Sequence, residues 1–248
     1  MKIRFLLYIL LFLIHYSQAV RPFITDDARV VGKNLAQWET WLRFDNISGQ
    51  NWHMFAYGPT NWMELSTGLV FGYDKPNYSG LEFSYALPLI QGKFLLKKYE
   101  ANKLPGIGIV AGTFVPSGKG AFVPRGYGGF SFLTLTQSIG QKDRLLVHAN
   151  AGVNILNEND VNNVLYTWGI GTQIKTYKGF HLVGEFFSGD PYVPGTGLSY
   201  QVGFRHFISE WIQIDATIGK GLSGDFVLPF WYSAGARFVT SIFSKNSL

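Results

Sequence analysis

Apolar and polar residues alternate along most of this chain, in segments of about ten residues. Residues 211–219 show the pattern clearly. One set holds Ile212, Ile214, Ala216 and Ile218, and the other holds Trp211, Gln213, Asp215, Thr217 and Gly219. Because side chains alternate between the two faces of a strand, this period predicts strands with one apolar and one polar face. Repeated to the C-terminus, it is typical of a barrel with apolar residues toward lipid and polar residues toward a lumen.

Twelve segments of this kind are expected, so the predicted fold is all-β, an antiparallel transmembrane β-barrel of about 12 strands. The expected strands are 35–45, 52–57, 63–73, 92–99, 106–115, 127–137, 144–154, 164–174, 180–188, 197–207, 211–219 and 229–239. Two short strands are expected near 78–87 and 92–99, separated by Pro88, which would interrupt the ladder of a central strand. Residues 92–99 are assigned to the wall and 78–87 to a hairpin within a long loop, because short and long connections then alternate. Short turns then alternate with longer loops, among them 46–51 and 155–163, and both chain ends lie on the periplasmic side.

The start of the chain has the features of a secretory signal peptide. Lys2 and Arg4 precede an apolar run, Phe5 to Ile14, that is too short to span a membrane as a helix. Ser17-Gln18-Ala19 suits cleavage before Val20, and an uncleaved anchor helix is the alternative. The predicted organisation is a signal peptide at 1–19, a periplasmic N-terminal segment at 20–34, the barrel at 35–243 and a C-terminal tail at 244–248.

Composition argues against several classes of function. Removing the two leader cations lowers the net charge from +5 to +3, and no basic stretch gathers on one element, so no nucleic-acid partner is expected. The chain has no cysteine, which leaves no disulfide to stabilise it. None of its five histidines has the spacing of a metal-ligand set or of a nucleophile–base pair. We therefore expect no metal, no cofactor and no enzymatic activity.

Charged residues on the faces predicted to be lumenal are few, and their sign alternates between neighbouring strands. Glu185, Arg205, Asp215 and Arg237 lie on four consecutive strands, which predicts an ion-pair network inside the barrel. The predicted lumen lining also includes Glu39, Arg43, Glu64, His148 and Asn150. Two interpretations stay open: a sealed barrel whose charges lock its interior, and a lining that contacts a passing solute.

Aromatic residues gather where the predicted strands meet their connections, as they do at the interfaces of a membrane. The set near the short turns is Trp62, Tyr99, Tyr177, Phe207 and Trp211, and the set expected at the opposite belt is Trp41, Tyr73, Tyr127, Tyr166 and Trp168. Part of this enrichment also follows from the ordinary preference of aromatic residues for strands.

Several short motifs resemble a family of outer-membrane barrels of Gram-negative bacteria that is named after the meta-pathway of phenol degradation. The motifs are Arg21-Pro22-Phe23-Ile24-Thr25-Asp26-Asp27-Ala28, Tyr57-Gly58-Pro59-Thr60-Asn61-Trp62, Val115-Pro116-Ser117-Gly118 and His148-Ala149-Asn150-Ala151-Gly152. The resemblance implies transport of small hydrophobic or aromatic molecules. The chain departs from the usual barrel ending, because five residues follow Phe243, so Phe243 or Phe238 would provide the terminal aromatic residue that barrel assembly favours.

The expected function is a channel or transporter for small, hydrophobic or aromatic molecules in the outer membrane. The expected partners are outer-membrane lipid, a small hydrophobic solute and the barrel assembly machinery. The alternatives are a barrel lipid hydrolase and a purely structural barrel. A Ser–His contact on the outer wall would indicate a hydrolase, and a path through the lumen would indicate a channel.

Overall fold

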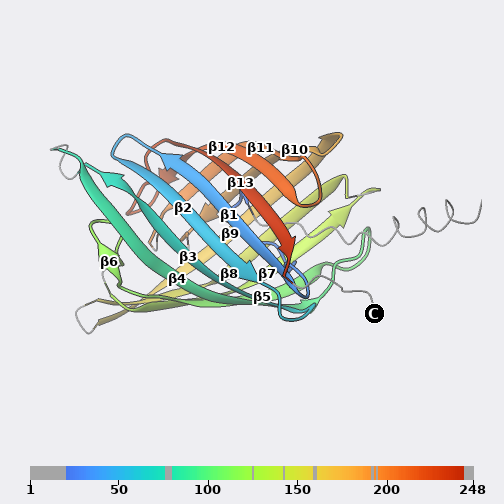
Figure 1. The fold of residues 1–248 in the computed structure, drawn as a ribbon, viewed down its shortest axis with the longest axis horizontal. Coiled ribbons are helices and arrows are strands. Elements are labelled where there is room, and N and C mark those ends of the chain that lie inside the picture. Colours follow the sequence, from blue (N-terminus) through green and yellow to red (C-terminus); the bar gives the residue numbers. More distant parts are fainter. Residues whose placement is uncertain are drawn as a thin grey trace, which may run out of the picture.

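Twelve antiparallel strands close into a β-barrel, as the sequence predicts (Figure 1). The computed structural model describes residues 21–75, 80–124, 126–141, 143–158, 161–190, 193 and 195–242. The wall is formed by β1 (Leu35–Phe44), β2 (Ser48–Tyr57), β3 (Met63–Asp74), β4 (Glu82–Lys97), β5 (Gly106–Phe114), β7 (Gly128–Ile139), β8 (Leu145–Glu158), β9 (Val161–Tyr177), β10 (Phe180–Ser188), β11 (Leu198–Phe207), β12 (Ile212–Ser223) and β13 (Trp231–Ser241). A short strand, β6 (Gly118–Lys119), pairs with β4.

The barrel closes where its first strand meets its last. β1 pairs with β13 along its whole length, from Leu35 opposite Ser241 to Phe44 opposite Tyr232. Closure leaves the wall without a free edge, so the backbone groups of the strands bond within the sheet, as a hydrocarbon environment requires. Within the described ranges, no helix is long and apolar enough to cross a membrane.

The fourth strand differs from the expected one. Residues 78–87 and 92–99 were expected as separate strands, but the structure has one strand, β4, that runs from Glu82 through Pro88 to Lys97. A bulge accommodates the proline, because Gly68 lies opposite Leu89 while Val70 lies opposite Ala86. A β-bulge leaves one residue out of the ladder, and that is a place where the missing N–H of proline is tolerated.

Two of the expected long loops are strand in the structure. β2 begins at Ser48, so only residues 45–47 separate it from β1. The Asp45 carboxylate accepts the N–H groups of Ile47 and Ser48 at 2.9 and 2.7 Å, which is how a short aspartate side chain closes a tight turn. β8 and β9 continue to Glu158 and from Val161, so this hairpin replaces the loop expected at 155–163.

The predicted faces of the strands are confirmed. Leu65 exposes 45% of its surface on the outside, whereas its neighbour Ser66 exposes 6%. Most of the expected outer belt also points outward, including Tyr127 and Tyr166. Trp41 is an exception, because it faces the lumen and stacks on Trp52. The predicted signal peptide, its cleavage site, Phe243 and the C-terminal tail lie outside the described residues.

Candidate functional site

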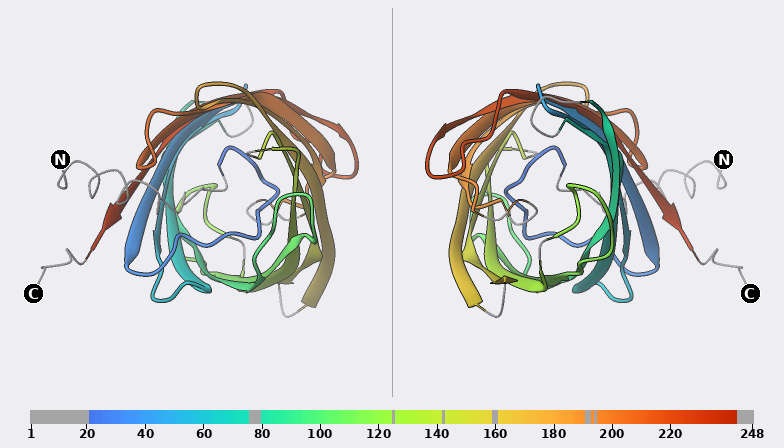
Figure 2. Two further views of the ribbon diagram at one scale, coloured as in Figure 1. Left: turned by 90° about the vertical axis from the view of Figure 1, so that its right-hand side faces the viewer. Right: turned by 90° about the vertical axis from the view of Figure 1, so that its left-hand side faces the viewer.

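The interior of the barrel is crossed by its own N-terminal segment. We call residues 21–34 the plug. Figure 2, viewed along the barrel, shows the plug folded across the lumen. From the sequence, this stretch is predicted to lie on the periplasmic side, but the structure places it inside the barrel. Most of it is buried, with Thr25, Asp27 and Ala28 each at most 2% exposed. The plug lacks the alternation that would let it join the sheet, so its backbone groups must find side-chain partners in the lumen.

Carboxylates of the wall accept hydrogen bonds from the plug backbone. Glu185 on β10 accepts the N–H groups of Ile24 and Thr25 at 2.7 and 2.8 Å. Glu64 on β3 accepts the N–H of Val31 at 2.8 Å. Hydrogen bonds to a charged acceptor are stronger than neutral ones, and they satisfy buried N–H groups that would otherwise be costly. Glu64 and Glu185 therefore hold two separate points of the plug.

Neutral side chains of the wall bind the plug carbonyls. The donors are Gln201 Nε2 to Pro22 (2.8 Å), Gln213 Nε2 to Arg21 (3.1 Å) and Thr134 Oγ1 to Asp26 (2.8 Å). In the opposite sense, Thr136 Oγ1 accepts the N–H of Ala28 at 2.9 Å. These partners come from β7, β11 and β12, so the plug is bound across the lumen and not along one strand.

Two ion pairs join the plug to the wall. Arg21 Nη2 lies 2.7 Å from Asp215 Oδ1 on β12, and Lys93 Nζ on β4 lies 2.5 Å from Asp26 Oδ1. Lys93 is 1% exposed and the Asp215 side chain is fully buried, so neither charge is screened by water. Each pair lies within the barrel, where removing one partner would leave the other charge uncompensated.

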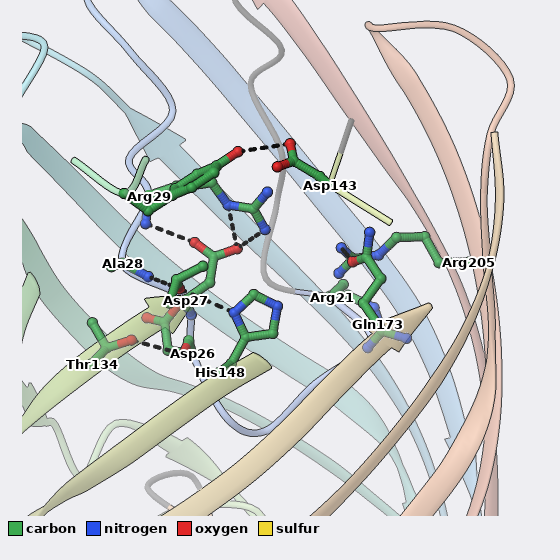
Figure 3. A network of polar contacts seen from close by, with 12 residues as sticks. Arg21, Asp26, Asp27, Ala28, Arg29, Thr134, Asp143, His148, Gln173 and Arg205 are labelled. Atoms are coloured by element: carbon green, nitrogen blue, oxygen red, sulfur yellow. Dashed lines mark hydrogen bonds and ion pairs between the residues drawn. The ribbon is translucent and has the colours of Figure 1, made fainter. Parts of the chain in front are cut away.

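A third ion pair shapes the plug itself. Arg29 Nε donates to Asp27 Oδ2 at 3.0 Å, and the Arg29 backbone N–H donates to Asp27 Oδ1 at 2.8 Å (Figure 3). Burial alone would raise the pKa of the Asp27 carboxyl, but the charges of Arg29 and Lys93 lower this pKa well below its usual range. Asp27 therefore carries its negative charge inside the lumen.

The four residues predicted to form an ion-pair network do lie on adjacent strands of the wall. Arg205 is directly opposite Asp215 in the ladder of β11 and β12. The carboxylates, however, also bind the plug. Asp215 pairs with Arg21, and Glu185 accepts the N–H groups of Ile24 and Thr25 as well as a hydrogen bond from Gln201 on the wall at 2.5 Å. Arg205 Nη1 donates to Gln173 at 2.6 Å, and Arg237 Nη2 donates to the carbonyl of Glu210 at 3.3 Å.

The other predicted lining residues also face inward. Glu39 lies opposite Arg237 and accepts a hydrogen bond from Gln37 at 3.1 Å. His148 is fully buried and meets Thr136 at 3.0 Å. With its amide oriented to satisfy its neighbours, Asn150 accepts the N–H of Asp26 at 2.6 Å. Arg43 is the penultimate residue of β1, and its guanidinium carbon lies 4.6 Å from the centre of the Trp231 ring.

Lys93, Arg21 and Asp26 belong to the site but are not among the residues predicted from the sequence. Lys93 follows Gln91 on the inward face of β4, so its alternation could have marked it as lumenal. Arg21 and Asp26 belong to a stretch without periodicity, and no local pattern indicates that they fold back into the barrel.

Apolar side chains fill much of the remaining lumen toward the long-loop end. One cluster consists of Leu89, Val110, Phe114, Phe130 and Phe132. A second contains Trp52, Val70 and Ala86 with Trp41, Phe122 and Val123 packed against them, and a third contains Phe187, Leu228 and Trp231 with Ile24 and Val193. The lumen therefore has a polar half around the plug and an aromatic half, which the plug contacts through Ile24.

His53, which faces outward on β2, bears on the hydrolase alternative. Its Nδ1 accepts a hydrogen bond from Trp38 Nε1 at 3.2 Å, and its Nε2 lies 2.5 Å from Asn51 Oδ1. Both ring nitrogens thus have a partner, and neither partner is a nucleophile.

Comparison with known proteins supports the architecture. No family model and no curated protein matches the chain. Among solved structures, it is similar to the COG4313 outer membrane channel from Pseudomonas putida F1, with a TM-score of 0.66 and 11% identity over 86% of this chain and 98% of that one. It is also similar to the KdgM porin, with a TM-score of 0.55 and 11% identity over 82% and 98% of the two chains. For the NanC porin the TM-score is 0.52, with 8% identity over 84% and 100%. The chain thus has the fold of outer-membrane β-barrels.

Proposed function

We propose that this protein is an outer-membrane channel for small molecules and that the plug closes it. The observation that carries the proposal is a closed barrel whose lumen holds a segment bound by side chains instead of by strand pairing. Such a segment can leave without breaking the wall. The barrels with TM-scores above 0.5 include one named as a channel and two named as porins, which fits this role.

The solute that we propose is small and hydrophobic or aromatic. Trp41, Trp52 and Trp231 all face the lumen, and three apolar clusters line its aromatic half. Apolar and aromatic walls favour solutes of the same kind. We also propose membership of the phenol-degradation barrel family, on the motifs that resemble it.

A purely structural barrel is the second candidate, and one observation favours it. Arg205, Arg237, His148 and Gln213 are fully buried around the plug, so no water reaches these side chains while the plug is in place. The two candidates differ in whether the plug moves.

Planar-bilayer recordings and solute-uptake assays test this difference. Deleting residues 21–31 from the mature chain should raise the single-channel conductance several-fold, because it removes the segment that fills the polar half. An unchanged conductance would support the structural barrel.

A disulfide between plug and wall provides the converse test, since the chain has no cysteine of its own. A Cβ placed at Gly169 would lie 3.3 Å from the Cβ of Thr25, close to the separation in natural disulfides. The Thr25→Cys/Gly169→Cys variant should lose uptake when oxidised and regain it on reduction. The single Thr25→Cys variant is the matched control and should not respond to reductant. Equal uptake in the oxidised and reduced double variant would contradict gating by the plug.

A further inference from the structure

A hollow of about 700 Å³ lies on the outer surface of the barrel, near the end that carries the short turns. It crosses β13, β1, β2, β3 and β4, which are neighbours in the wall and lie side by side in Figure 1. Side chains that line it, such as Leu65 and Ile90, point away from the lumen and are about half exposed. Its volume falls within the range of about 300–1,000 Å³ that is usual for ligand sites.

Three aromatic rings form the edge of the hollow that faces the long-loop end. Phe238, Trp38 and Phe55 are direct neighbours across β13, β1 and β2. The Trp38 ring stacks on both of the others, with ring centres 5.4 Å from Phe238 and 6.3 Å from Phe55. All three rings point outward, and each exposes between 38% and 46% of its surface. The rings therefore form a raised apolar edge whose outer surface is open to the membrane.

Short side chains form the floor of the hollow on the other side of this edge. Ala36 lies two residues closer to the short turns than Trp38 and points the same way. Its direct neighbours across the ladder are Thr240 on β13 and Tyr57 on β2. Because Ala36 and Thr240 are much shorter than the rings beside them, the outer surface drops at this place. An apolar hollow in a lipid-facing wall excludes water, so a hydrocarbon chain is the group that fills it.

The position of the hollow along the strands selects one leaflet of the membrane. Ala36 is the second residue of β1, and Thr240 is the second-last residue of β13, both at the short-turn end. In barrels of this class the short turns are periplasmic, so the hollow lies in the periplasmic leaflet. Two exposed lysines, Lys33 and Lys97, lie still closer to this edge of the wall. Lysines at a membrane surface attract the anionic groups of lipids.

We propose that this hollow binds one acyl chain of a phospholipid from the periplasmic leaflet. The chain lies over Ala36 and Thr240 against the stacked rings, and the lipid phosphate lies near Lys33 and Lys97. The site is independent of the channel function, because it is on the outside of a closed wall. It covers the seam where β1 meets β13, since Ala36 lies opposite Thr240. A lipid that binds only the closed barrel therefore stabilises the folded protein.

Native mass spectrometry of the purified protein in detergent, titrated with dioleoylphosphatidylglycerol, tests the site. Ala36→Phe and Thr240→Phe fill the floor from two different strands, and each should weaken binding of the first lipid about tenfold through lost apolar contact. Ala151→Phe is the matched control, because Ala151 is an exposed alanine of β8, across the barrel, and its replacement should leave binding unchanged. Lys33→Gln/Lys97→Gln should weaken dioleoylphosphatidylglycerol while leaving the phosphate-free dioleoylglycerol unchanged.

Thermal unfolding provides a second measurement. The phospholipid should raise the Tm of wild-type protein and of Ala151→Phe but not that of Ala36→Phe, and heat-modifiable migration on a gel verifies that each variant is folded. Equal affinity for the first lipid in wild-type protein and both filled variants would overturn the proposal. So would retention of detergent or lipopolysaccharide in place of phospholipid. A dimer that Ala36→Phe abolishes would also overturn it, by identifying a second copy of the chain as the occupant.

Discussion

The two halves of the lumen are built on different chemistry. In the polar half, charged and amide side chains meet the plug, as in the Lys93–Asp26 pair at 2.5 Å. In the aromatic half, packed apolar residues such as Leu89 and Val110 fill the space, and both belong to strands of the wall. Polar contacts between buried groups require defined partners, whereas apolar packing requires only shape and volume. The polar half therefore fixes the plug in one position, and the aromatic half stabilises the wall.

The largest effect is expected at the centre of the polar half. Lys93→Met leaves the Asp26 carboxylate buried without its cation, and we expect the free energy of unfolding to fall by about 3–5 kcal/mol. Denaturant titration in detergent measures this loss. The double variant Lys93→Met/Asp26→Asn removes both charges and should recover most of the stability. No recovery would mean that the pair does not account for the loss. Neutralising Lys103, whose pair with Glu100 is exposed, should change nothing measurable.

The aromatic half should respond to lost volume. Leu89 is 1% exposed, so Leu89→Ala should lower the free energy of unfolding by about 2–5 kcal/mol through lost transfer energy and a cavity. Because Leu89 packs with wall residues, this variant should keep the wild-type conductance, whereas Lys93→Met should raise it. An equal rise in conductance in both variants would contradict the idea that only the polar half holds the plug in place.

A double-mutant cycle sharpens the description of the polar half. Asp215 forms its ion pair with Arg21, although Arg205 is its ladder neighbour. The coupling energy between Arg21→Ala and Asp215→Asn should reach about 0.5–3 kcal/mol, the range of residues in direct contact. Coupling between Arg205→Ala and Asp215→Asn should be smaller. A larger coupling energy for Arg205 with Asp215 than for Arg21 with Asp215 would favour an ion pair within the wall over the contact with the plug.

The smallest effect concerns pH. The pKa of Asp27 is lowered in the folded protein by Arg29 and Lys93, against the effect of burial. A lowered carboxyl pKa adds stability that is present above the unfolded value of 3.8 and is lost as the pH falls below it. Asp27→Asn should therefore lower the Tm at pH 7, and the difference from wild type should shrink toward pH 3. A difference that stays constant with pH would show that the charge of Asp27 is not involved.

The barrel wall could be predicted well because its signal is local. Alternation places Leu65 outside and Ser66 inside whatever the neighbouring strands do. The count of twelve follows once 78–87 is assigned to a loop, because short and long connections then alternate. The single β4 strand was not predicted, because a proline argues against a central strand when only the local sequence is considered. The bulge between Gly68 and Val70 of the neighbouring strand lets β4 continue through Pro88, and this bulge depends on tertiary structure. The continuation of β8 and β9 to Glu158 and from Val161 was also missed, because residues 155–163 do not alternate between apolar and polar side chains.

The sequence by itself determined the fold class, the faces of the strands and the inward charges such as Glu185 and Asp215, because each of these follows from a period of two residues. Only the tertiary structure decided what those charges bind. The plug has no period, and its partners lie far away in the chain, as in Val31 with Glu64, 33 residues apart, and Arg21 with Asp215, 194 residues apart. Contacts at such separations depend on closure of the barrel, which brings strands from the whole chain around one segment.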